Sequence, residues 1–138
     1  MKTLVVLAVS IVLVSILFCP MAMAAPSMPT DLQMVQPDPS LPKELSAFLG
    51  KWELIGNPER LFVIVEKIDD EKASLWIWTI TQDGNSPTWV RGEAQVIRER
   101  GKYKLWRSGR FGNTEYTLKG EYLFLSLPTG GVKLIRVP

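Results

Sequence analysis

The chain has 138 residues, which is enough for one domain, a net charge of +2, no histidine and a single cysteine. The lack of histidine excludes Ser-His-Asp triads, Cys-His pairs and histidine-based zinc sites. Lysines and arginines alternate with acidic residues instead of forming a basic stripe, so we expect no nucleic-acid surface. We predict a protein without cofactor that is not an enzyme. The remaining catalytic alternative is a carboxylate pair for glycoside chemistry, drawn from Glu53, Glu93 and Glu115.

Residues 1–24 have the pattern of a secretory signal peptide. Lys2 precedes an apolar run over residues 3–18, and Ala22 to Ala24 supplies the small residues of a cleavage site. The run is shorter than the ~20 residues of a membrane-spanning helix. Cys19 follows a phenylalanine, which argues against a lipoprotein. We therefore expect an exported protein, periplasmic or extracellular, whose mature chain has no disulfide and no membrane span.

Residues 25–43 contain five prolines and predict an extended, flexible arm, because proline interrupts both helices and central strands. The simpler interpretation is a tether that holds the domain away from a surface. The alternative is an arm that inserts into a partner protein, with Leu32, Met34 and Val35 as contacts.

From residue 44 onward the pattern predicts a β-barrel domain that ends at residue 138. Residues 44–49 can form one helical turn, and Gly50 ends it. The apolar period then changes to two, and short turn sequences separate the apolar segments. We predict strands over residues 51–55, 61–68, 73–80, 88–97, 103–107, 111–118, 121–127 and 132–137. This spacing indicates an all-β, antiparallel up-and-down barrel of about eight strands, and no segment is left for the crossover helices of an α/β fold.

The predicted closure of the barrel depends on Gly50, Trp52 and Arg136. An inward Trp52 on the first strand can plug one end, and Gly50 lets the preceding turn lie close beneath it. Arg136 lies on the last strand, which pairs with the first in a closed barrel, so it can cover the indole and donate to the turn. The predicted core comprises Phe48, Trp52, Leu54, Val63, Val65, Val90, Ala94, Val96, Leu105, Tyr116, Leu118, Leu123, Leu125 and Leu134.

With the sequences Phe48 to Glu53 and Val65 to Asp69, this arrangement resembles the calycin superfamily, and in particular the small lipocalin-like domains of bacterial exported proteins. The resemblance covers residues 44–138. It implies an eight-strand barrel with a small ligand in or near its interior. The predicted strands are shorter than those of large lipocalins.

Trp76 and Trp78 share one face of their strand, and Leu75 and Ile77 share the other. We favour tryptophans that point inward and fill the barrel, which leaves at most a small cavity. The alternatives are a tryptophan-lined ligand pocket or an exposed aromatic patch. A ligand would bind at the open end, opposite Trp52. Its predicted contacts are Trp76, Trp78, Trp89, Arg91, Trp106 and Arg107.

Within this set, Arg91 and Arg107 on neighbouring strands could hold an anionic head group, although an arginine near a carboxylate is more often a surface ion pair. The favoured function is therefore non-catalytic binding of a small amphipathic or hydrophobic ligand at the barrel mouth. A protein-interaction module is the alternative. Periplasmic metalloprotease inhibitors share the plan of an arm followed by a barrel, but they carry a disulfide that this chain lacks.

Overall fold

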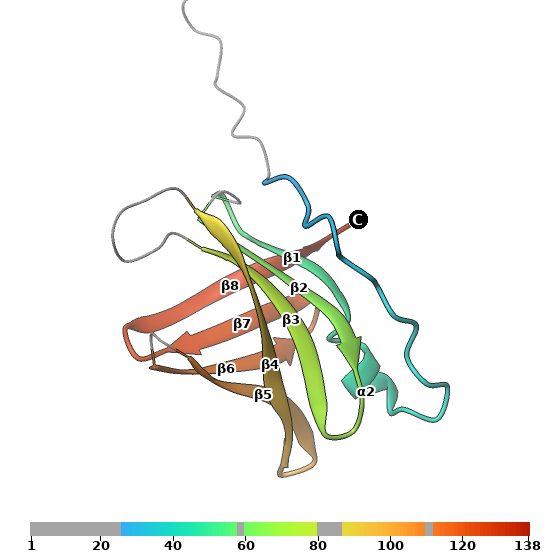
Figure 1. Ribbon diagram of the computed structural model, residues 1–138. Helices are drawn as coiled ribbons and strands as arrows, with labels where there is room; N and C mark the ends of the chain where they lie inside the picture. The colour runs from blue at the N-terminus through green and yellow to red at the C-terminus, as the bar shows by residue number, and fades with distance from the viewer. Residues whose placement is uncertain (1–25, 58–59, 80–86, 110–111) are drawn as a thin grey trace, which may run out of the picture.

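The computed structural model describes residues 26–57, 60–79, 87–109 and 112–138. It consists of a closed barrel in which eight antiparallel strands follow one another in chain order (Figure 1). This confirms the predicted all-β, up-and-down fold. The predicted signal peptide over residues 1–24, with Cys19, lies outside the described residues.

One helical turn, α2 (Lys43–Ser46), precedes the barrel. Strands β4 and β5 are longer than predicted, and together they form a hairpin whose tip lies at residues 100–101. The strands are β1 (Gly50–Leu54), β2 (Leu61–Ile68), β3 (Lys72–Thr79), β4 (Thr88–Glu99), β5 (Lys102–Gly109), β6 (Gly112–Lys119), β7 (Tyr122–Leu127) and β8 (Gly130–Val137).

The core lies inside the barrel and continues to the apolar side of α2. Alternate residues of every strand point inward, because strand side chains alternate between the two faces. The predicted core is confirmed except at Val90, which is 40% exposed, and at three residues that are only partly buried, Leu54, Val96 and Leu118.

A β-bulge in β2 decides which side chains face outward. Val65 pairs with Leu75, but the next paired residue is Lys67, opposite Ser74, so Glu66 has no partner in the ladder. An extra residue in one strand shifts the alternation. Ile68 therefore enters the core, while the Glu66 side chain lies on the outer surface of the barrel wall among apolar neighbours.

The outer face of the same strands carries a second apolar cluster. Phe62 and Ile64 of β2 and Trp76 of β3 are buried there, and Trp78 and Trp89 pack against them. The preferred prediction of inward tryptophans is therefore wrong. Leu75 and Ile77 take the inner face, and a covering segment buries Trp76 on the outside. We call Phe62, Ile64, Trp76, Trp78 and Trp89 the outer aromatic cluster.

The covering segment is the proline-rich arm. In Figure 1 it runs along the outside of the barrel towards α2. Leu32 packs against the outer aromatic cluster, and the backbone N–H of Val35 donates to the Glu66 carbonyl at 2.8 Å. The expected tether thus lies against the barrel instead of projecting from it, since it covers apolar surface that would otherwise face water.

Gly50, Trp52 and Arg136 come together at the α2 end of the barrel. Trp52 is 1% exposed, and its indole N–H donates to the Phe48 carbonyl at 3.0 Å. Arg136 pairs with Trp52 across the β1–β8 ladder and lies over the indole, 4.2 Å from the ring centroid. Its guanidinium also donates to the carbonyls of Ala47 and Leu49.

The position next to the Arg136 guanidinium requires a glycine, Gly50, which has no side chain. Its φ is +126°, and a Cβ at this position would lie 2.5 Å from Nη1 of Arg136. Any other residue would be strained and would displace the arginine. This end of the barrel is consequently sealed by side chains.

Candidate functional site

The barrel interior is open at the end opposite Trp52. A cavity of about 510 Å³ enters the barrel there, and its wall is mostly aliphatic. The predicted filled interior is wrong, because Trp76, Trp78 and Trp89 belong to the outer aromatic cluster and Trp106 lines a hollow outside the cavity. Val90 is exposed for the same reason, since it faces this cavity. The lining comprises Leu54, Arg60, Leu61, Ile77, Thr79, Val90, Arg107, Gly109, Gly112, Thr114, Tyr116, Leu125, Leu127 and Val132.

Arg107 is the charged group within the barrel wall of this cavity. It pairs with Thr114 across the β5–β6 ladder, so both side chains point inward. Two glycines make room for it: a Cβ at Gly92 would lie 2.7 Å from Nε, and a Cβ at Gly109 would lie 3.0 Å from Nη1. Any side chain at Gly92 would push the guanidinium away from this position.

Tyr116 is the polar partner of Arg107. The phenol is 1% exposed, and burial raises its pKa to about 12, although the charge of Arg107 and a hydrogen bond with it act in the opposite direction. Tyr116 is therefore neutral at physiological pH. Among the described residues, no carboxylate forms an ion pair with Arg107.

The wall beside Arg107 is incompletely paired. β4 pairs with β3 along Thr88–Gln95, but with β5 only from Gln95 to Glu99. Residues 107–109 of β5 pair with β6 alone. A seam therefore opens between β4 and β5, and the Arg107 side chain lies in it.

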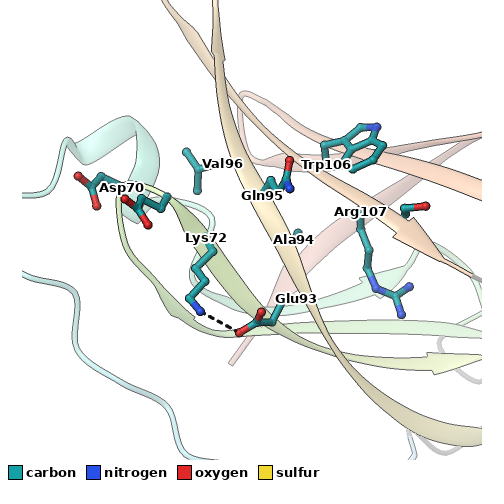
Figure 2. Close-up of a pocket in the computed structure, with 10 residues that line it drawn as sticks. Asp70, Lys72, Glu93, Ala94, Gln95, Val96, Trp106 and Arg107 are labelled. Atoms are coloured by element: carbon teal, nitrogen blue, oxygen red, sulfur yellow. Dashed lines mark hydrogen bonds and ion pairs between the residues drawn. The ribbon is translucent and has the colours of Figure 1, made fainter.

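A hollow lies on the outer side of this seam. Figure 2 shows Arg107 and Trp106 on one side of it and the pair Lys72–Glu93 on the other, with their charged atoms 3.3 Å apart. Both charges of that pair are well exposed, so the pair contributes little stability. Arg107 lines the hollow as well as the cavity, so one side chain separates the two spaces.

The six predicted ligand contacts are distributed over three places. Arg107 lies in the cavity, and Trp106 lines the outer hollow. The others, Trp76, Trp78, Trp89 and Arg91, lie together on the outer face. Arg91 and Arg107 thus point to opposite faces of the wall and cannot grip one head group.

Glu66, which sequence reasoning missed, binds Arg91. The carboxylate is 2% exposed; it accepts from the Trp76 indole N–H at 2.8 Å, from Arg91 Nη2 at 2.5 Å and from the Gln33 backbone N–H at 3.4 Å. Burial raises its pKa, but hydrogen bonds from Trp76, Arg91 and Gln33 outweigh this, so the pKa of Glu66 lies below its ordinary value. A signal existed: residues 61–68 are apolar on both faces, which indicates that both are covered.

The three candidate catalytic carboxylates are not brought together at the cavity. Glu93 pairs with Lys72 and Glu115 with Lys104, and neither these residues nor Glu53 lines the interior. Within the described part of the chain, no group of three or more His, Cys, Asp or Glu side chains is placed to hold a metal. In those same residues, no helix is long and apolar enough to cross a membrane.

Comparison of the chain with protein-family models, curated proteins and solved structures found no match. The resemblance to calycins therefore stays a prediction. The candidate site is defined by its geometry: a mostly aliphatic cavity, closed at one end, whose lining includes two arginines and three residues with hydroxyl groups.

Proposed function

We propose that this chain is an exported, non-catalytic binding protein that takes a small amphipathic anion into the open end of its barrel. The observation that carries the proposal is the position of Arg107. Its guanidinium faces an aliphatic cavity, and no carboxylate among the described residues pairs with it. Arg107 is only partly exposed, and a partly desolvated cation is stabilised by a counter-charge. A ligand carboxylate would supply that charge.

The groups around Arg107 are suited to bind a carboxylate or a similar planar anion. A guanidinium donates in a fork that matches two oxygens of one ligand group. The hydroxyl groups of Thr114 and Tyr116 line the same region and can donate further hydrogen bonds. Arg60 is exposed at the mouth, where its charge would attract an approaching anion.

The aliphatic wall of the cavity favours a ligand that carries an apolar tail. Ile77, Leu125 and Val132 lie in this wall, and the volume of about 510 Å³ falls within the range of ordinary small-molecule sites. Burial of a tail there would gain roughly 25 cal/mol for each Å² removed from water. The combination favours an acid with one head group and a short chain or ring.

The test compares ligands that differ only in charge. The mature protein is titrated calorimetrically with medium-chain carboxylic acids and with the alcohols of equal length. We expect carboxylates to bind at least 10-fold more tightly, and Arg107→Gln to remove that preference while leaving tail binding. Arg91→Gln is the matched control, because Arg91 lies outside the barrel and should leave binding unchanged. Equal binding of acid and alcohol to the parent protein would contradict the proposal.

Native mass spectrometry of the protein purified from its own host addresses the identity of the ligand. A retained acidic metabolite or lipid would support the cavity as a binding site. Protein that is free of ligand and takes up none of the acids tested would instead favour the protein-interaction alternative.

A further inference from the structure

The contacts between the arm and the barrel use the main chain of the arm. Glu66 accepts the Gln33 N–H through its carboxylate and the Val35 N–H through its carbonyl. The Trp89 indole N–H donates to the Ser27 carbonyl at 2.7 Å. Leu32 supplies the arm side chain that packs into the outer aromatic cluster, whereas Met34 is 46% exposed. An extended segment needs only one aliphatic side chain in the correct register to satisfy this surface.

The barrel side of the contact is built without the arm. Trp76 and Arg91, both barrel residues, hold the Glu66 carboxylate in place, and Arg91 also lies 5.2 Å from the Trp76 ring centroid. The Glu66 carbonyl is available because the bulge removes it from the β2–β3 ladder. The surface is therefore preorganised, and it does not require that the arm belong to the same chain.

The connection between the docked arm and the barrel contains an exposed turn at residues 38–40, just before Leu41, which packs against the core. Asp38 accepts from the backbone N–H and the hydroxyl of Ser40, and its carbonyl accepts from Leu41 N–H. The two side-chain bonds are exposed. If this turn straightens while Leu41 stays on the core, residues 36–40 can span roughly 17 Å. Pro37 and Pro39 favour such an extended form.

We propose that Glu66 and the outer aromatic cluster form a docking site that accepts the arm of a second copy of this chain, so that two copies can exchange arms. The contacts are the same within one chain and between two chains, as in domain swapping. The two forms then differ mainly in effective concentration, which is millimolar for a short linker. The wild-type arm therefore docks on its own barrel at ordinary protein concentrations. The arm of a second copy binds only when the barrel's own arm cannot dock.

A complementation experiment tests this inference independently of the cavity. One variant, Leu32→Asp, has a defective arm and an intact docking site. A second, Glu66→Lys, has an intact arm and a defective docking site. Each is exported from the full chain and measured by native mass spectrometry alone and as an equimolar mixture. We expect monomers from each variant alone and a one-to-one complex in the mixture.

The control replaces Leu32→Asp by Met34→Asp, which adds the same charge at an exposed arm position. Its own arm still occupies its docking site, so we expect no complex with Glu66→Lys. Circular dichroism verifies that each variant is folded, and Glu66→Leu, which removes the side-chain acceptors, serves as the docking-site variant if Glu66→Lys does not fold. A mixture of folded variants that stays monomeric would overturn the inference, as would a complex of equal strength with the Met34→Asp control.

Discussion

Arg136 and Arg107 lie on inward positions near opposite ends of the same barrel. They differ in how much of the space around the guanidinium is filled by protein groups. Arg136 is fully engaged, with the Trp52 indole beneath it and the carbonyls of Ala47 and Leu49 as acceptors. Arg107 has the Tyr116 hydroxyl as a partner and a cavity beside it. One arginine seals its end of the barrel, and the other lines an open cavity.

The difference comes from what each strand register places opposite the arginine. Arg136 faces a tryptophan across β1–β8, and a large ring leaves no space. Arg107 faces Thr114 across β5–β6, and Gly92 and Gly109 flank it, so these three neighbours leave space beside the guanidinium. In this barrel, the volume of the cross-strand neighbour decides whether an inward arginine packs against a ring or lies beside a cavity. Three experiments sharpen or break this comparison.

The largest expected effect is at the sealed end. Trp52→Ala should destabilise the protein by about 3–5 kcal/mol, because it removes a buried ring and leaves a cavity under Arg136. Urea unfolding followed by circular dichroism measures the change. A variant as stable as the parent would show that Trp52 does not close the barrel.

A smaller effect should appear at the open end as the pH rises. Tyr116 is neutral in the folded protein up to about pH 12, whereas in the unfolded chain it ionises near the ordinary value of 10.0. A raised folded pKa contributes stability below pH 10 that is lost as the pH rises towards 12, with a total of about 2–3 kcal/mol. Tyr116→Phe should lose less stability than the parent between pH 10 and 12. Identical alkaline profiles in chemical unfolding would contradict the burial of this phenol.

The smallest effect compares the two arginines directly. Arg136→Gln should cost about 1–2 kcal/mol, because it removes the cation from the indole and two donors from the helical turn. Arg107→Gln should change stability by less than about 0.5 kcal/mol, since few interactions are lost and a cation leaves an aliphatic cavity. Thermal unfolding of both variants measures the contrast. A larger loss for Arg107→Gln would assign Arg107 a structural role.

Much of the architecture follows from the sequence alone. The period-two pattern and the turn sequences predict eight antiparallel strands in chain order, because each short turn forces neighbouring strands to pair. Closure of the barrel pairs the last strand with the first, so the sequence alone predicts that Arg136 lies near Trp52. These features can be predicted because they depend on local turn sequences and because strands joined by short turns pair in chain order.

The tertiary structure alone decided which face of β3 is the inner one. Leu75 and Ile77 on one face and Trp76 and Trp78 on the other are equally apolar, so alternation does not distinguish them. Two non-local features do. The bulge at Glu66 shifts the phase of β2, and the arm, distant in sequence, covers the outer aromatic cluster. The open cavity, the isolation of Arg107 from Arg91 and the buried Glu66 all follow from that choice, because a side chain's environment is set by segments that its own strand sequence does not contain.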